Sequence, residues 1–201
     1  MKNYSDRLSE NFHHFENLQK IVAKYGFPVG GGSYMMDGKS LDYHRETFEK
    51  QEILFEFAKK CKKALEIGNY AGHSLFIMLI ASDDILIDAN DINWFEFTKP
   101  CIDYLNSNFN NRITYYPMNS IDLLPTLSSK YDLIHIDGQH DPTHISAELA
   151  YCEFLSHDET FFVIDDIEGA IHGMQAHLHK LNLISRPECL WPNAIYKKIK
   201  I

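Results

Sequence analysis

The sequence has no long apolar run and no apolar leader. Its longest apolar stretch, Leu75–Ala81, is much shorter than the roughly 20 residues needed to span a bilayer. The first ten residues, MKNYSDRLSE, do not contain the apolar segment of a secretory signal. We therefore expect a cytoplasmic protein without a membrane partner.

The chain also lacks paired cysteines. The four cysteines, Cys61, Cys101, Cys152 and Cys189, are scattered and form no C-x-x-C pair. This spacing suggests neither a zinc knuckle nor a disulfide framework. We expect four reduced thiols, as is usual in the cytoplasm.

Basic tracts are missing as well. The net charge is −9, and the lysines and arginines form only short pairs such as Lys62-Lys63 and Lys197-Lys198. Proteins that bind nucleic acid through its phosphates usually present a basic face. The charge therefore argues against a nucleic-acid partner.

What the chain does contain is an alternation of strand-like and helix-like segments from residue 64 onward. Apolar runs predict strands at 64–67, 85–89, 113–116, 133–136 and 161–164. The segments between and after them predict helices at 74–81, 95–106, 120–127 and 144–155. This alternation is typical of an α/β protein with a parallel sheet covered on both faces. Segments 181–190 and 194–201, joined by a short W-P-N turn, predict a final antiparallel hairpin.

The part before residue 45 reads differently. Residues 5–25 predict an amphipathic helix, followed by a loop at 26–42 that contains Gly30-Gly31-Gly32. We interpret this loop as a flexible lid or connector rather than an anion-binding nest, because no strand or lysine accompanies the glycines. A second helix at 45–60 leads into the first strand. At 201 residues we expect one domain, with 1–44 as its N-terminal helix and lid loop and 45–201 as its core.

The most informative segment is ALEIGNYAGHS at 64–74, a strand end followed by a Glu-x-Gly-x-x-x-Gly turn. Gly68 can adopt a positive φ, and Gly72 allows the following helix to pack closely. Glu66 ends the strand, where a carboxylate favours a cationic ligand group. The spacing is neither that of a dinucleotide-binding fingerprint nor that of a P-loop.

Two later strands end in carboxylates. Asp137 follows the strand in YDLIHIDGQH, and Asp165 and Asp166 follow the strand in FFVIDDI. Ligands bind at this edge of an open α/β sheet, and three converging carboxylates call for a cation. Oxygen ligands favour Mg²⁺, with Mn²⁺ or Ca²⁺ as alternatives. The other interpretation is that these aspartates only cap helices or begin turns.

The motifs EIGNYAGHS, Asp91, HIDGQH and VIDDI occur in the order found in metal-dependent O-methyltransferases. Over roughly 45–201 the chain resembles class I S-adenosylmethionine-dependent enzymes of the catechol O-methyltransferase-like group. It resembles more closely the sugar and macrolide O-methyltransferases related to macrocin O-methyltransferase. The resemblance implies a Rossmann-like methyltransferase fold: a mostly parallel seven-stranded sheet with helices on both faces and a C-terminal antiparallel hairpin.

The resemblance also assigns the cofactor, S-adenosylmethionine, to particular residues. Glu66, Gly68 and Tyr70 would line its methionine part, Ser74 would bind its carboxylate, and Asp91 would bind the ribose. Asp88 competes with Asp91 for the ribose role. The adenine loop would be Asn119 and Ser120. The predicted cofactor-binding set is Glu66, Gly68, Tyr70, Gly72, Ser74, Asp91, Asn119 and Ser120.

The same resemblance places a divalent metal on Asp137, Asp165 and Asp166, and a general base at His140. The metal would lower the pKa of an acceptor hydroxyl, and His140 would accept its proton. The catalytic pair is then His140 and metal-bound Asp137. We expect methyl transfer to a small hydroxylated molecule, with a sugar-type hydroxyl slightly preferred to a phenolic one. The family also makes a homodimer plausible.

Three other functions stay open. A methyltransferase-like module could bind the cofactor without turnover. His135 and Asp137 form an H-x-D, as in non-haem iron oxygenases, although those enzymes usually have all-β folds. A nicotinamide-dependent oxidoreductase would use a similar fold.

Several side chains outside the motifs have two interpretations. The histidines at 172, 177 and 179 are placed on the helix after Asp165-Asp166, where a polar face is favoured over a metal cluster. Tyr34, Met35, Met36 and Trp191 could wall the acceptor pocket or simply pack.

Overall fold

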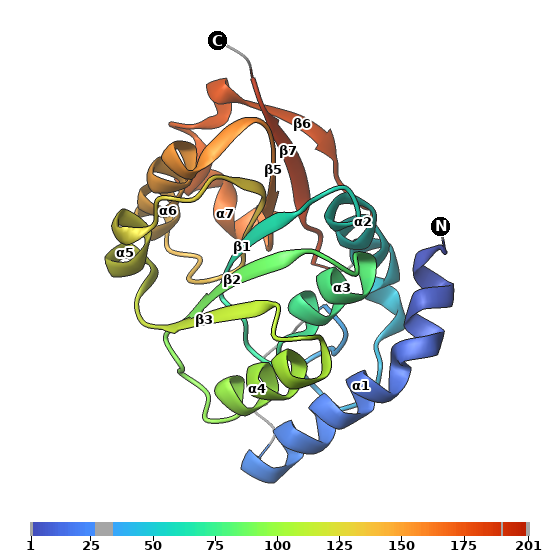
Figure 1. Cartoon of the computed structure of the whole chain (residues 1–201). Coiled ribbons are helices and arrows are strands. Elements are labelled where there is room, and N and C mark those ends of the chain that lie inside the picture. The colour runs from blue at the N-terminus through green and yellow to red at the C-terminus, as the bar shows by residue number, and fades with distance from the viewer. Residues whose placement is uncertain (1, 27–33, 190, 200–201) are drawn as a thin grey trace.

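The computed structural model describes residues 2–26, 34–189 and 191–199. Its centre is a seven-stranded sheet in the order β3-β2-β1-β4-β5-β7-β6 (Figure 1). The strands are β1 Lys63–Ile67, β2 Leu86–Asp91, β3 Ile113–Pro117, β4 Tyr131–Ile136, β5 Ser156–Ile164, β6 Leu181–Ser185 and β7 Ala194–Lys198. Neighbours among β1 to β5 pair in parallel, and β7 runs antiparallel to β5 and β6. The predicted Rossmann-like methyltransferase sheet with its C-terminal hairpin is confirmed.

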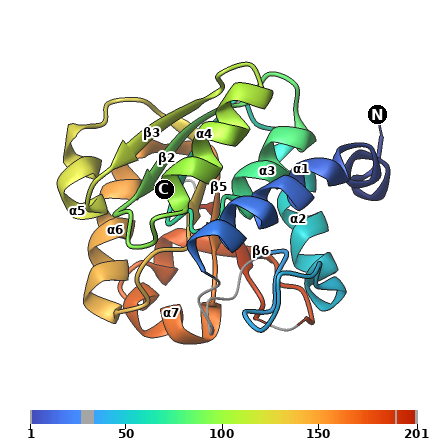
Figure 2. The ribbon, with the colours of Figure 1, turned by 90° about the horizontal axis from the view of Figure 1, so that it is seen from below.

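Helices cover both faces of this sheet, as predicted. One face carries α1 Tyr4–Tyr25, α2 Phe48–Ala58, α3 His73–Ala81 and α4 Thr98–Asn108; the other carries α5 Ser120–Leu123, α6 Pro142–Leu155 and α7 Ile167–Met174 (Figures 1 and 2). Short 3₁₀ turns at Arg45–Thr47, Leu124–Thr126 and Leu178–Lys180 complete the elements. Each face has its own hydrophobic core, so the molecule has three layers.

The helix α3 shows how burial decides an element's composition. All nine of its residues are buried, because it lies between the sheet and α1 (Figure 2). A helix enclosed on all sides needs apolar residues around its whole circumference. That explains the apolar run Leu75–Ala81, the longest in the sequence.

The N-terminal helix α1 packs on this same core. Its buried stripe includes Tyr4, Leu8, Phe15, Leu18 and Val22, at the spacing of one helix face. The side chain of Asn3 caps its first turn by accepting from the Asp6 amide at 2.9 Å. This stripe belongs to the same hydrophobic cluster as the buried residues of α2 and α3.

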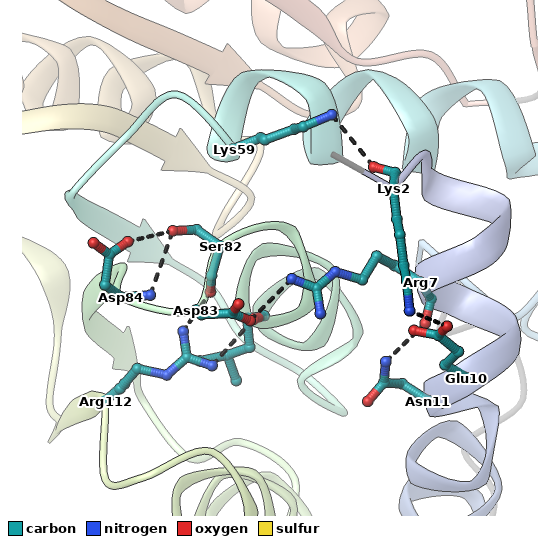
Figure 3. A network of polar contacts seen from close by, with 10 residues as sticks. Lys2, Arg7, Glu10, Asn11, Lys59, Ser82, Asp83, Asp84 and Arg112 are labelled. Carbon is teal, nitrogen blue, oxygen red and sulfur yellow. Dashed lines mark hydrogen bonds and ion pairs between the residues drawn. The ribbon is translucent and has the colours of Figure 1, made fainter.

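Polar contacts attach the outer side of α1 (Figure 3). Arg7 pairs with Asp83 at 3.0 Å, in the loop after α3, and Lys59 reaches the Lys2 carbonyl at 3.4 Å. Arg112 donates to the Leu79 carbonyl at 3.0 Å, which ties the start of β3 to the same region. Exposed pairs of this kind contribute little each, so the buried stripe carries most of the attachment.

Some element boundaries differ from the predicted ones. β5 begins at Ser156 rather than 161, because its first residues are polar and do not resemble an apolar strand. β6 ends at Ser185, well before 190. α6 begins at Pro142, where Asp141 accepts from the Thr143 and His144 amides at 3.0 and 3.1 Å.

The predicted placement of the late histidines is wrong. Only His172 lies on α7; the helix ends at Met174, His177 lies between elements and His179 lies in a 3₁₀ turn. His177 instead lies 2.7 Å from Glu153 on α6. The three histidines therefore do not share one helix face.

The predicted lid loop is described only in part. Gly30, Gly31 and Gly32 lie outside the described residues. Tyr34, Met35 and Met36, which follow them, are almost completely buried in the core. Among the residues that the structure describes, no helix has both the length and the apolar character to cross a membrane.

Candidate functional site

A cavity of about 660 Å³ lies at the carboxyl edge of β1, β2 and β4. Of the residues singled out from the sequence, it is lined by Tyr34, Gly68, Tyr70, Ser74, Asp91, Asn119, Ser120, Asp137, His140 and Asp166, but not by Met35, Met36 or Trp191. Glu66, Gly72 and Asp165 lie outside its lining. The cavity volume is within the usual range for small-molecule sites.

The turn after β1 brings bare backbone to this cavity. Gly68 has φ +85°, and a Cβ there would lie only 2.0 Å from the Asp137 carbonyl oxygen. The turn and the end of β4 are therefore in direct backbone contact, which only glycine permits. Gly72, with φ +76°, caps α3, and a Cβ there would lie 3.0 Å from Leu105 on α4.

The two candidates for a ribose-binding carboxylate occupy different environments. Asp91 lines the cavity, and its Oδ2 accepts from the Asn69 and Tyr70 amides at 2.9 and 3.2 Å. Asp88 lies farther down β2, where it accepts from the Tyr131 hydroxyl at 2.7 Å and pairs with Lys63. Only Asp91 is positioned to meet a ligand in the cavity.

At the other end of the cavity, Asn119 and Ser120 begin α5. Ser120 Oγ donates to Glu148 Oε1 at 2.6 Å and lies 3.1 Å from His144 Nε2. Glu148 is fully buried on α6; burial raises the pKa of its carboxyl, against the lowering effects of Ser120 and His144. Its Oε2 has no hydrogen-bond donor. Sequence reasoning missed Glu148 and His144, since both lie inside an ordinary helical pattern.

One end of the cavity, called here the acidic end, is formed by carboxylates that the register between β4 and β5 brings together. His135 pairs with Val163 across β4 and β5, so two residues later Asp137 and Asp165 also come opposite one another. Alternate residues of a strand point to the same face, which is here the face covered by α2. The Asp137 carboxyl reaches the cavity but is poorly solvated, and this burial together with Asp165 raises its pKa well above the usual range.

Asp166 and His140 form the outer part of the acidic end. Asp166 has φ +43° and precedes α7, and its Oδ2 lies 3.5 Å from His140 Nδ1. Burial and the neighbouring Asp165 raise the pKa of the Asp166 carboxyl. Both side chains are 40% exposed, so His140 is accessible to a ligand.

A lysine that was not predicted from the sequence lies at the inner part of the acidic end. Lys50, on α2, is 2% exposed, and its Nζ lies 2.7 Å from both carboxylate oxygens of Asp165. Only the contact with Oδ2 has hydrogen-bond geometry, which leaves Oδ1 without a donor but beside the ammonium. Burial acts to lower the pKa of Lys50, but Asp165 and Asp137 outweigh it and raise the pKa, so the amine stays charged.

Glu66 belongs to a buried hydrogen-bonded chain rather than to the cavity wall. Its Oε1 lies 2.7 Å from His135 Nδ1, and its Oε2 accepts from the Asn69 amide group at 2.8 Å. His135 Nε2 lies 3.0 Å from the Tyr34 hydroxyl, which also accepts from Asn193 at 2.8 Å. Because a carboxylate only accepts, Nδ1 carries a proton, and Nε2 is within hydrogen-bond distance of the Tyr34 hydroxyl. The role predicted for Glu66 at the methionine end of a cofactor stays a prediction.

The predicted metal ligands are Asp137, Asp165 and Asp166; the possible metal group among the described residues shares Asp137 and Asp165 with that set and has His135 in place of Asp166. Ligand atoms of His135, Asp137 and Asp165 lie within 4.8 Å of one another, close enough to consider an ion. However, both His135 nitrogens are engaged by Glu66 and Tyr34, and Asp165 faces the Lys50 ammonium through both oxygens. A divalent ion at these carboxylates would meet a buried positive charge, so the residues do not fit one as they are arranged.

The described part of the chain also gives little support to an iron site. The oxygenase pattern needs two histidines and one carboxylate with open positions. The possible metal group contains one histidine, His135, which is completely buried.

Comparisons with known proteins agree with this geometry. The sequence model of a family described as "Methyltransferase domain" matches residues 65–167, which span the glycine turn, Asp91, His140 and the acidic strand ends. None of the curated proteins matches the sequence closely enough to count as a relative.

Three solved structures illustrate the similarity of the fold. An O-methyltransferase from Bacillus cereus, in complex with S-adenosylhomocysteine, is 12% identical with a TM-score of 0.71, over 93% of this chain and 91% of that one. The O-methyltransferase TomG from Streptomyces achromogenes, involved in tomaymycin synthesis and in complex with S-adenosylmethionine, is 13% identical with a TM-score of 0.69, over 93% and 90%. The methyltransferase PaMTH1 from Podospora anserina, bound to S-adenosylhomocysteine, is 15% identical with a TM-score of 0.67, over 97% and 88%.

Proposed function

The chain belongs to this family of methyltransferase domains, and from that premise we propose that it is an S-adenosylmethionine-dependent O-methyltransferase acting on a small hydroxylated molecule. One observation carries the proposal: a single cavity joins the Gly68 turn, Asp91 and the acidic strand ends. The neighbours crystallised with the cofactor or its product support the choice of cofactor. We propose no macromolecular acceptor, because the cavity has the dimensions of a small-molecule site.

The cofactor would lie along the cavity from the glycine turn to α5. Gly68 and Tyr70 in the glycine turn would line its methionine end, and Ser74, which also lines the cavity, would bind its carboxylate. Asp91 would accept from the ribose hydroxyls, and Asn119 and Ser120 would border the adenine. This arrangement directs the sulfonium methyl toward Asp137 and His140.

His140 would act as the general base. Its Nδ1 faces Asp166, so Nε2 is the nitrogen that accepts the proton of the acceptor hydroxyl. The acceptor oxygen then forms a bond with the methyl carbon as the carbon–sulfur bond breaks, and the electron pair stays on sulfur. The products are the methyl ether, S-adenosylhomocysteine and a proton on His140. The protein contributes orientation and charge, since the sulfonium already activates the methyl group.

The sequence resemblance implies a divalent ion that the contacts of Lys50 do not favour. Mg²⁺, or Mn²⁺ or Ca²⁺, would be held by Asp137, Asp165 and Asp166, yet Lys50 engages Asp165. We therefore derive no step through a metal. A cytoplasmic location and a homodimer also remain proposals.

The experiment that tests this function combines binding and turnover. Isothermal titration of the purified protein with S-adenosylhomocysteine should show binding, and a screen of hydroxylated acceptors should show methyl transfer. His140→Gln should lower kcat by about 100-fold or more while leaving the affinity for S-adenosylhomocysteine unchanged. The control is His172→Gln, an exposed histidine on α7, which should leave both unaltered. Absence of cofactor binding would reject the proposed function.

A further inference from the structure

Lys50 lies where the sequence resemblance would place a metal ion. Its Nζ contacts both oxygens of Asp165, and Asp137 comes opposite Asp165 in the register of β4 and β5. Asp165 itself is only 4% exposed. A buried carboxylate in this position needs a counter-charge, and the chain provides one from α2.

The surroundings of Lys50 fix it in this position. Its Nζ lies 4.3 Å from the centroid of the Tyr34 ring, a cation–π contact. Tyr34 is held in turn by the His135 ring at 3.0 Å and by Asn193 at 2.8 Å. The lysine is therefore enclosed by an aromatic face and a carboxylate, and only 2% of its surface is exposed.

His135, the histidine of the possible metal group, is engaged by other residues as well. The Glu66 carboxylate accepts from His135 Nδ1, and Nε2 is hydrogen-bonded to the Tyr34 hydroxyl. Releasing Nε2 for a metal would require Tyr34 to move, and Tyr34 is part of the enclosure of Lys50. Lys50 and the hydrogen bond between His135 and Tyr34 both exclude an ion, and they stabilise one another.

We infer that Lys50 supplies, from within the chain, the positive charge that a divalent ion would supply, so that methyl transfer here needs no metal and favours phenolic or enolic hydroxyls over aliphatic ones. This inference rests on the proposed function. Lys50 is a positioning residue, because it holds Asp165 behind the cavity and does not line it.

The preference among acceptors follows from proton-transfer chemistry. An imidazole base has an ordinary pKa of about 6.5. A phenol, with a pKa of about 10, can give up its proton to such a base during the reaction. An aliphatic alcohol has a much higher pKa, so it gives up its proton to such a base far less readily unless a Lewis acid lowers that pKa. Without that Lewis acid, the slight preference for a sugar-type hydroxyl inferred from sequence reverses in favour of a phenolic one.

The test begins with metal binding, measured separately from turnover. Wild-type protein freed of metal by chelation is titrated with Mn²⁺ and followed by electron paramagnetic resonance. We expect no binding up to about 1 mM in the wild type and at least about tenfold tighter binding in Lys50→Ala, which opens the carboxylates. Lys60→Ala, an exposed lysine just after α2, is the control and should behave as the wild type.

The wild-type measurement decides the question even if Lys50→Ala does not fold. Specific binding of Mn²⁺ by the wild type below about 1 mM, together with loss of methyl transfer on chelation, would overturn the inference. Lys50→Arg, which keeps the charge, should remain unable to bind Mn²⁺.

Turnover with excess chelator then tests the acceptor class. Matched phenolic and sugar acceptors should differ by about 100-fold or more in kcat/KM, in favour of the phenols. Equal turnover of a sugar hydroxyl under chelation would contradict the preference. Failure of S-adenosylhomocysteine to bind would reject the proposed function, whereas the Mn²⁺ titration would still report on Lys50.

Discussion

At the scale of single residues, the protonation of His73 makes the stability of the folded protein depend on pH. Its imidazole is buried at the start of α3, against the ring of Phe15 at 5.4 Å, and this burial lowers its pKa to about 3. Between about pH 6.5 and pH 3 the unfolded chain therefore binds a proton that the folded chain does not. Stability contributed by the neutral form is complete above about pH 6.5 and is lost as the pH falls.

This shift predicts the pH dependence of unfolding. Across that window the free energy of unfolding should fall by up to about 1.4 kcal/mol per pH unit because of His73 alone. His73→Gln, which cannot titrate, should show a shallower slope in urea unfolding measured from pH 7 to pH 4. Parallel slopes for the two proteins would contradict the assignment.

A pair of aspartates on β2 tests the cofactor position. Asp91→Asn should weaken S-adenosylhomocysteine binding by about ten- to a hundred-fold, because a charged acceptor facing the ribose is lost. Asp88→Asn is the matched control, since Asp88 is engaged by Tyr131 and lies away from the cavity lining. Isothermal titration measures the affinity of each variant for S-adenosylhomocysteine. A larger loss of affinity in Asp88→Asn than in Asp91→Asn would instead assign ribose binding to Asp88.

Residues that end strands were predictable, whereas those contributed by remote segments were not. Asp91, Asp137 and Asp166 follow apolar runs, so their place at the sheet edge could be read directly from the sequence. Lys50 and Asn193 meet the site only through tertiary packing. Nothing in the helical pattern around Lys50 distinguishes it from an exposed lysine.

At the scale of elements, the turn between β1 and α3 depends on the absence of a side chain at one position. A Cβ at Gly68 would lie 2.0 Å from the Asp137 carbonyl oxygen, and its φ of +85° adds backbone strain. Gly26 has a similar φ of +83°, but a Cβ there would meet nothing within 4 Å. Substitutions at the two glycines therefore distinguish the cost of a steric clash, present only at Gly68, from the cost of a positive φ, present at both.

We expect Gly26→Ala to cost about 1 kcal/mol and Gly68→Ala more than about 3 kcal/mol in the free energy of unfolding. Chemical denaturation measures both, and Gly68→Ala should also lose cofactor binding. Similar costs for the two variants would mean that the turn has room to adjust.

Element types were predicted well, and boundaries less well, for a physical reason. The buried segments β1 and α3 have strong apolar patterns that fix their type. The first residues of β5 are polar, and so is the segment after α7, where His177 lies 2.7 Å from Glu153. Such contacts join distant residues and leave no local signal.

At the scale of the whole molecule, α1 should unfold together with the sheet. Phe15, 1% exposed, packs against Tyr43 with ring centroids 5.6 Å apart and against His73 on α3. Phe15→Ala should therefore cost about 3–5 kcal/mol in global stability. The control, Phe154→Ala, removes a ring that is 77% exposed and should cost under about 0.5 kcal/mol.

The same experiment tests the interpretation of residues 1–44 as part of one domain. Hydrogen exchange should protect α1 to the same degree as β4, with a single unfolding transition. An early separate transition confined to α1 would instead indicate an independent unit. The three-layer architecture itself was predictable, because alternating strands and helices leave few ways to cover a parallel sheet.

The hydrogen bond between Tyr34 and Asn193 joins residues 159 positions apart and encloses Lys50. During synthesis the ribosome must therefore release β7 and the turn before it before this enclosure can close. Until then Lys50 and the strand-end carboxylates have no fixed arrangement, and contacts at such separation form slowly. A nascent chain can thus form the contact between the glycine turn and Asp137 before the enclosure of Lys50 forms.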